Sequence, residues 1–259
     1  MVKSMSETVK KKILAICGSP TKGMTYKALK DIEKSYPDID YKIISIKDAN
    51  IEQCIGCYQC VQKGEERCPL KDDRDMIIDE MNKADGVIFA SPVYVNHVSG
   101  LMKNFMDRIG YNTHRPSYFD KFAMVIGVCR GFGADKVAEY LGGILTTFGF
   151  NVVSSLELQY SSRSDKEIQF NHEKIIGGMD TLLEKIEKGN KNKPELLQVI
   201  MFNLFKYISE AHPDEYSADY EYYKDKSGYY YDTKMKFFHN FIAGRVVKQF
   251  DGDMLKNRM

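Results

Sequence analysis

Five short apolar segments, each followed along the chain by a helix-like segment, organise the first 188 residues. The apolar segments cover residues 11–17, 41–46, 86–90, 122–129 and 151–158. The helix-like segments cover residues 25–36, 73–83, 99–109, 134–148 and 166–188. Short, nearly continuous apolar runs are typical of parallel strands that are buried on both faces. The alternation therefore predicts an α/β fold with a doubly wound, flavodoxin-like, five-stranded parallel sheet, and any ligand is expected beyond the carboxyl ends of the strands.

A polar stretch, Gly189–Pro194, interrupts this pattern and indicates a domain boundary. We expect a flavodoxin-like domain over residues 1–189, with a cysteine-containing loop at 54–68, and a helical C-terminal extension over residues 190–259 that is rich in Tyr and Phe. Apolar residues recur near helical spacing at the start of the extension and predict an amphipathic helix: Leu196, Leu197, Ile200, Leu204 and Ile208. The aromatic residues that follow form either a lid or partner surface or, as we expect, part of a packed appendage.

Composition excludes several classes of protein. The chain has 37 Lys and Arg against 36 Asp and Glu, a formal net charge of +1, so no global field attracts nucleic acid. The longest nearly apolar stretch, Gly86–Val95, is far shorter than the roughly 18–20 residues that a membrane-spanning helix needs. The apolar run at residues 13–18 is also shorter than the roughly 7–15 residues of a secretory signal. We expect a cytoplasmic protein with no nucleic-acid partner and no membrane span.

Three polar or glycine-containing loops, residues 18–25, 91–99 and 127–133, accompany the ends of the first, third and fourth predicted strands. Because parallel strands end at the same edge of a sheet, these loops are expected to form one site. In the first loop, backbone N–H groups at the start of a helix and the hydroxyls of Ser19, Thr21 and Thr25 suit a phosphate group. The spacing matches neither a Walker loop nor a G-x-G-x-x-G loop, and a polar turn without a ligand is the alternative for this loop taken alone.

Four cysteines, Cys54, Cys57, Cys60 and Cys68, lie within one short segment and form the strongest chemical signal in the chain. Three thiolates at two-residue gaps suit one face of a compact cluster, and ferredoxins use the same opening. The spacing favours one [4Fe–4S] cluster with all four cysteines as ligands. Zinc, or bare thiols that form a redox disulfide, are the alternatives, although zinc sites usually present two separated C-x2-C pairs.

Four motifs together resemble the NADPH-dependent FMN reductase superfamily and, within it, the iron-sulfur flavoprotein branch. They are GSPTKGMT at 18–25, CIGCYQC at 54–60, DDRDMIIDEMNKADGVIFASPVYVNHVSGLMKNFMDR at 72–108 and the glycine loop at 130–133. The resemblance covers about residues 11–188 and implies a flavodoxin-like fold that binds FMN. It further implies the FMN-contacting residues: Ser19, Thr21, Met24 and Thr25 around the phosphate, Pro92, Val93, Tyr94 and Asn96 along the ribityl chain and ring, and Gly131 and Gly133 at the other edge of the ring.

A chain that holds both groups is expected to be an oxidoreductase or electron-transfer protein, because flavin accepts electron pairs whereas an iron-sulfur cluster carries single electrons. The expected donor or acceptor is a small molecule such as NAD(P)H or a ferredoxin-like protein. The resemblance also implies a homodimer or higher homo-oligomer, since the cluster of one subunit lies near the flavin of another in that family. The alternatives are a cluster-free NAD(P)H-dependent reductase of quinones, nitro compounds or free flavin, and a zinc-stabilised binding module.

No catalytic residue is assigned from the sequence. His97 in the second loop is a candidate proton donor, although a role in lining the pocket is favoured. Lys103, Asp107 and Arg108 follow on the next predicted helix, where a solvated helix face or a local ion pair is expected.

Overall fold

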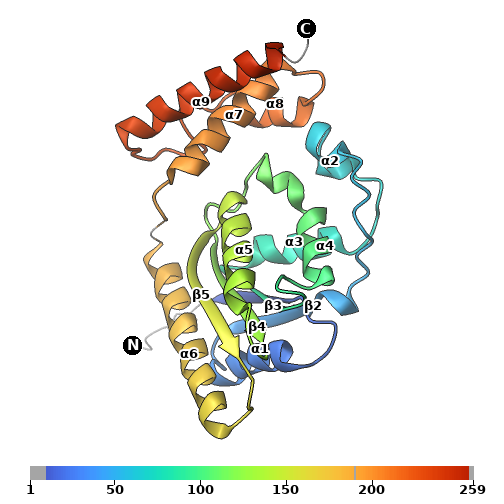
Figure 1. Ribbon diagram of the computed structural model, residues 1–259, viewed down its shortest axis with the longest axis vertical. Helices are drawn as coiled ribbons and strands as arrows, with labels where there is room; N and C mark the ends of the chain where they lie inside the picture. The colour runs from blue at the N-terminus through green and yellow to red at the C-terminus, as the bar shows by residue number, and fades with distance from the viewer. Residues whose placement is uncertain (1–9, 190, 257–259) are drawn as a thin grey trace, which may run out of the picture. The chain divides into compact units, whose positions relative to one another are not determined.

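The computed structural model describes residues 10–189 and 191–256, and these residues form two compact units (Figure 1). The first unit holds residues 10–53, 72–109 and 118–189. The second holds residues 54–71, 110–117 and 191–256. The cysteine segment, which the sequence analysis assigned to the first domain, therefore packs together with the C-terminal residues.

The first unit is built on a five-stranded parallel sheet with the strand order β2-β1-β3-β4-β5. The strands are β1 Lys12–Cys17, β2 Asp40–Ser45, β3 Gly86–Pro92, β4 Phe122–Cys129 and β5 Asn151–Gln159. Residues of β1, β3 and β4 are almost entirely buried because both faces of the sheet are covered. This strand order is that of the flavodoxin-like fold, so the predicted fold class is confirmed.

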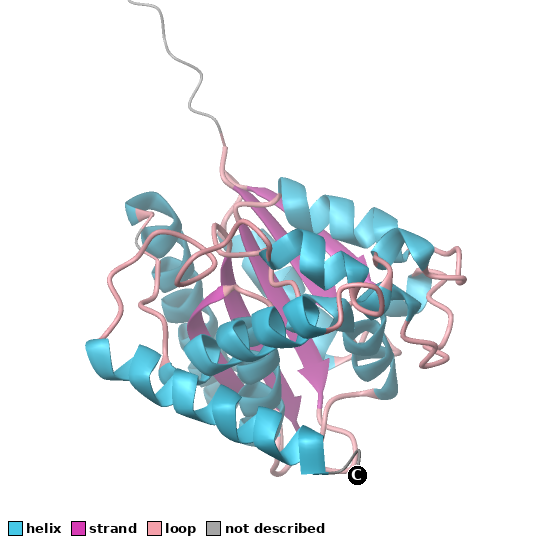
Figure 2. Ribbon diagram, turned by 90° about the horizontal axis from the view of Figure 1, so that it is seen from above, coloured by secondary structure: helices cyan, strands magenta, loops and turns pink. Residues whose placement is uncertain are grey.

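Helices cover both faces of this sheet (Figure 2). They are α1 Met24–Ser35, α3 Arg74–Lys83, α4 Gly100–Arg108, α5 Ala134–Thr147 and α6 Asp165–Lys188. Helices α1 and α6 share a core with alternate residues of β1, in which Ala15 and Cys17 pack with Ile32 and Met179. Helix α5 packs on β4 and β5 on the opposite face of the sheet, where α3 and α4 also lie (Figure 1). The crossovers leave the carboxyl ends of β1, β3 and β4 side by side, as the register pairs Cys17 with Ala90 and Ala90 with Ile126.

The second unit has its own aromatic core. Its helices are α2 Gln59–Gln62, α7 Leu196–Ala211, α8 Ser217–Tyr223 and α9 Phe237–Lys256. The core residues are Val199, Phe202, Phe205, Tyr223, Tyr229 and Ala243. The predicted apolar face of α7 was partly wrong: Leu197 is 63% exposed, and the buried apolar residues of this helix are Val199, Phe202 and Phe205. Among the helices described, none is long and apolar enough to cross a membrane.

Candidate functional site

The loop after β1 leads into α1 through a tight backbone arrangement. The N–H of Gly18 donates to the carbonyl of Ala90 at 2.8 Å, and a Cβ at this glycine would lie 2.8 Å from the Cβ of Met102. Ser19 is buried, and its hydroxyl donates to the carbonyl of Thr21 at 2.7 Å. Gly23 occupies the N-cap of α1 and offers no side chain to the N–H groups of the first turn. Because those N–H groups have no partner inside the helix, the loop fits a phosphate group.

Ser99 joins this first loop to the second. Its hydroxyl donates to the carbonyl of Gly18 at 2.5 Å and accepts from the N–H of Met102 at 3.1 Å, so it also caps α4. Its own N–H donates to the hydroxyl of Ser91 at 3.0 Å. The two loops are therefore held together by buried hydrogen bonds.

The second loop ends in a tight turn at residues 94–97. The backbones of Tyr94 and His97 exchange hydrogen bonds of 2.9 and 3.1 Å, and Val95 and Asn96 between them have φ values of +50° and +62°. A positive φ is strained for a β-branched residue such as Val95, which is fully exposed. Strained backbone of this kind is concentrated at binding sites and switch regions. The turn thus presents an exposed tyrosine ring and a polar side chain at the sheet edge.

The third loop contacts the second at Gly133. This residue has a φ of +93°, and a Cβ there would lie 2.5 Å from Oδ1 of Asn96 and 3.0 Å from Cγ1 of Val93. The N–H of Val93 also donates to the carbonyl of Val128 at 2.8 Å. Phe132 is 82% exposed, so it is not a packing residue in this chain. All three predicted loops therefore meet at one end of the sheet.

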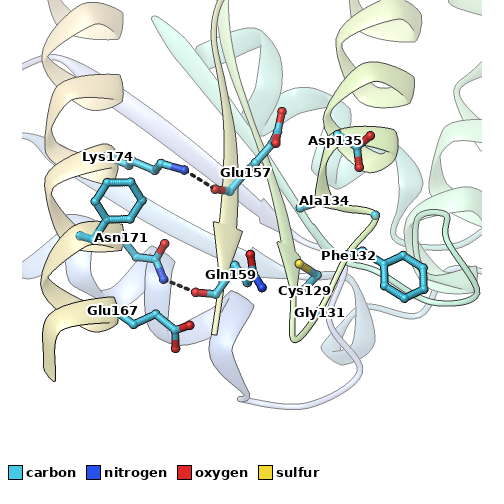
Figure 3. Close-up of a pocket in the computed structure, with 12 residues that line it drawn as sticks. Cys129, Gly131, Phe132, Ala134, Asp135, Glu157, Gln159, Glu167, Asn171 and Lys174 are labelled. Carbon is cyan, nitrogen blue, oxygen red and sulfur yellow. Dashed lines mark hydrogen bonds between the residues drawn. The ribbon is translucent and has the colours of Figure 1, made fainter. Parts of the chain in front are cut away.

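A cavity of about 290 Å³ opens beside the third loop, at the ends of β4 and β5 (Figure 3). Cys129 contributes to its lining, and burial raises the pKa of this thiol although its sulfur accepts hydrogen bonds from the backbone N–H groups of Ala134 and Gly131. On the other side, Asn171 and Lys174 of α6 donate to the carbonyls of Gln159 and Glu157 at 2.6 and 3.0 Å (Figure 3). These bonds occupy carbonyl groups of the edge strand β5 and so oppose the addition of another strand there.

Of the ten residues predicted to contact FMN, seven lie on these three loops: Ser19, Thr21, Val93, Tyr94, Asn96, Gly131 and Gly133. The structure places Met24 and Thr25 in the first turn of α1 and Pro92 at the last position of β3. Ser19 and Thr25 are buried, whereas Thr21, Tyr94 and Gly131 are exposed. His97 is exposed, and its ring lies 4.6 Å from the ring of Tyr140. Contact of these side chains with a flavin stays a prediction.

Outside the short helix α2, the cysteine segment is irregular, and it has three positive φ values, +64° at Gly56, +59° at Tyr58 and +116° at Gly64. No disulfide joins its thiols, and their exposure ranges from the open Cys57 to the buried Cys68. Among the residues described, no three His, Cys, Asp or Glu side chains are arranged for a metal ion. Four thiols are the donor set that an iron-sulfur cluster requires, but their positions in this structure do not by themselves form a site.

Arg108 and Asp72 form a buried ion pair that the sequence pattern does not predict. The expectation of a solvated face was wrong for Arg108, whose side chain is 1% exposed and donates to Asp72 and to the carbonyl of Glu52. The expectation of a local ion pair holds for Lys103 and Asp107 on the same helix. Burial opposes ionisation of Asp72, but hydrogen bonds from Arg108 and from backbone N–H groups outweigh it and hold the pKa of this carboxyl below its usual value.

Comparison with known proteins identifies the family. The family model described as NADPH-dependent FMN reductase matches residues 11–164, which contain the three loops and the cysteine segment. The chain belongs to this family. Within it, the similar curated proteins are iron-sulfur flavoproteins, so the chain lies in that branch of the FMN reductase family. The membership supports FMN as the cofactor and an FMN-dependent oxidoreductase as the class of protein.

Individual relatives extend this assignment. The chain is 30% identical over 203 residues to an iron-sulfur flavoprotein of Clostridioides difficile (strain 630), covering 73% of this chain and 85% of the relative. It is 38% identical over 144 residues to an iron-sulfur flavoprotein of Archaeoglobus fulgidus, covering 53% of this chain and 64% of that relative. The solved structure of RosB with a bound riboflavin-phosphate intermediate matches with a TM-score of 0.52 at 12% identity, covering 88% of this chain and 92% of RosB. That likeness concerns the fold alone.

Proposed function

We propose that this FMN reductase family member is a homo-oligomeric electron-transfer oxidoreductase that couples FMN to one [4Fe–4S] cluster held by Cys54, Cys57, Cys60 and Cys68. FMN supplies hydride and single-electron chemistry when bound. FMN binding is supported by one observation, the convergence of three loops at the sheet edge. The Ser99–Gly18 hydrogen bond joins the first two loops, and the close contact of Gly133 with Asn96 joins the second and the third.

The chain's own groups suit the parts of FMN in order along the sheet edge. The open first turn of α1 suits the phosphate, because backbone N–H groups and the helix dipole favour an anion. The turn at residues 94–97 and the backbone of Gly131–Gly133 suit the ring, since glycine lets the backbone approach a flat ligand closely. His97 is retained as a candidate proton donor because it is exposed on the same turn.

The cluster proposal is supported by the cysteine spacing and by the similarity to iron-sulfur flavoproteins. The alternative is a cluster-free NAD(P)H-dependent reductase. The two proposals differ in one measurable quantity, the iron and acid-labile sulfide bound per chain. We give precedence to the cluster because four thiols in one short segment suit few other ligands.

A homodimer or higher homo-oligomer is supported by apolar side chains that are exposed in the cysteine segment and at the carboxyl edge of the sheet. In the cysteine segment Ile55 and Tyr58 are 63% and 66% exposed, and at the sheet edge Val95 and Phe132 are exposed as well. Each of these side chains is available for contact with a second copy of the chain. The partner in electron transfer is proposed to be NAD(P)H, another small molecule or a ferredoxin-like protein.

The test is anaerobic purification followed by an absorption spectrum and assays of FMN, iron, zinc and acid-labile sulfide per chain. A flavin spectrum with about four irons and four sulfides supports the proposal. Flavin without iron supports the cluster-free reductase, and zinc without flavin supports a binding module. Loss of iron in Cys57→Ser with retention of FMN would assign the ligands to the cysteine segment.

A further inference from the structure

The short helix α2 carries Cys60 and cannot be stable by itself. It has only four residues, Gln59–Gln62, whereas isolated helices shorter than about 12 residues are marginal in water. Its last carbonyl groups have no partner within the helix. Each of them is bonded by a side chain from another part of the second unit: the carbonyls of Cys60 and Val61 accept from Arg115 at 2.5 and 2.8 Å, and that of Gln62 accepts from Ser217 at 3.4 Å.

Arg115 has the geometry to hold two of these carbonyls at once. Its guanidinium group is planar, and its two terminal nitrogens donate to the neighbouring carbonyls of Cys60 and Val61. The side chain is 7% exposed and is neutralised by Asp219 and by Glu65, the latter at 2.9 Å. A buried guanidinium with two carboxylate partners has little freedom to leave this position.

The C-terminal extension fixes Arg115. Asp219 belongs to α8, its side chain is 1% exposed, and it binds both Arg115 and Nδ1 of His114, the latter at 2.8 Å. The ring of His114 stacks on Phe205 of α7 with centroids 4.0 Å apart. Tyr223 of α8 donates to the carbonyl of His114 at 2.5 Å. A further bond runs from Lys63, just after α2, to the carbonyl of Asp214 at 2.5 Å.

We propose that the C-terminal extension is a clamp for the cysteine segment, in which Asp219 orients Arg115 and Arg115 orients α2 and therefore Cys60. Both are positioning residues, since they act through the backbone of the segment and not on a reacting group. The clamp itself stands on the contacts of the second unit. Only its consequence, retention of a cluster by a pre-ordered cysteine segment, rests on the proposed function.

The experiment begins with the iron-free full-length chain and follows amide hydrogen exchange at residues 59–63. We expect Arg115→Ala and Asp219→Asn to accelerate exchange there by tenfold or more and Arg115→Lys to have an intermediate effect, since lysine offers one compact donor. Lys224→Ala is the matched control because it removes an exposed cation at the end of α8 whose ion pair is with Glu221 on the same helix. Millimolar guanidinium ion, but not sodium ion at the same concentration, is expected to slow exchange again in Arg115→Ala.

Rescue by guanidinium separates this role from a general loss of stability, which an added cation of low concentration would not repair. A second control, Phe202→Leu, weakens the core of the extension without touching the guanidinium, and its exchange at residues 59–63 is expected not to respond to guanidinium. Unchanged exchange in both Arg115→Ala and Asp219→Asn would overturn the clamp. So would acceleration that guanidinium does not reverse.

Iron, sulfide and FMN per chain are then measured after anaerobic reconstitution. The proposal expects Arg115→Ala and Asp219→Asn to bind several-fold less iron than the wild-type chain while FMN content is unchanged. If the wild-type chain binds no iron but exchange responds as expected, the clamp stands and the cluster proposal fails. If the wild-type chain and the variants bind iron equally, the consequence for the cluster is overturned.

Discussion

The hydroxyl of Ser99 donates to the carbonyl of Gly18 at 2.5 Å and connects two loops that are far apart in the sequence. The same oxygen accepts from the N–H of Met102 and so begins α4. Because Gly18 has no room for a Cβ beside Met102, the first loop can lie directly on the start of this helix. The phosphate-binding geometry of one loop thus depends on the capping residue of another.

Replacement of this hydroxyl is the first prediction. Ser99→Ala is expected to cost about 2–3 kcal/mol of unfolding free energy, since it removes a helix cap and leaves a buried carbonyl without its donor. It is also expected to weaken FMN binding about tenfold, because the first loop loses its anchor. Urea unfolding and a titration of flavin fluorescence measure the two effects.

Ser164→Ala is the matched control for Ser99→Ala. Ser164 caps α6 by accepting from the N–H of Glu167 at 3.3 Å but has no bond to the first loop. We expect a loss of about 1 kcal/mol and no change in FMN affinity. Equal FMN affinities for both variants would contradict the role given to Ser99.

Alanine substitution is predicted to have different effects on stability at two glycines of the third loop. Gly133→Ala places a Cβ against Asn96 and Val93 at a φ of +93°, so we expect a loss of about 1–3 kcal/mol in the flavin-free protein. Gly131→Ala meets no atom within 4 Å, and its stability is expected to stay within about 0.5 kcal/mol of the wild type. If Gly131 lies against the flavin as proposed, this second variant nevertheless binds FMN more weakly. Thermal unfolding without FMN and FMN titration distinguish these outcomes, and unchanged FMN binding in Gly131→Ala would remove that residue from the site.

The turn at residues 94–97 gives a third prediction. Val95 holds a left-handed conformation that costs a non-glycine residue roughly 1–2 kcal/mol, whereas asparagine tolerates it better. Val95→Asn is therefore expected to stabilise the flavin-free chain by about 0.5–1 kcal/mol in urea unfolding. Val95→Ile keeps the β-branched side chain and serves as the control without a gain. A loss of stability in Val95→Asn would show that the exposed side chain makes a stabilising contact that the strain argument omits.

The sheet and the convergence of its loops were predictable because they follow from local patterns. Apolar runs gave β1 and β4 to within about a residue, and parallel strands must bring their carboxyl ends together. Arg108 was not predictable, since helical periodicity assigns it to a surface that the chain around Glu52 and Asp72 covers. The ion pair of Arg115 and Asp219 was not predictable for a related reason. They are ordinary polar residues far apart in the sequence, and no spacing rule brings them together.

The buried pair of Asp72 and Arg108 gives the last prediction. Asp72→Asn leaves the guanidinium of Arg108 buried without its counter-charge, and breaking such a pair typically costs about 3–5 kcal/mol. Asp107→Asn, which breaks only the exposed pair with Lys103, is the control and is expected to cost at most about 1 kcal/mol.

The pH dependence of this loss tests its electrostatic origin. The folded protein holds the pKa of Asp72 below its usual value, which is about 4 in an unfolded chain. The carboxylate therefore contributes stability that is fully present above about pH 4 and is lost as the pH falls through the lower folded pKa. Wild type and Asp72→Asn should differ most in unfolding free energy at neutral pH, and the difference should shrink in acid below about pH 4. Urea unfolding over a series of pH values measures this convergence. A difference that stays constant into acid would mean that Asp72 acts through its shape and neutral hydrogen bonds, not through its charge on Arg108.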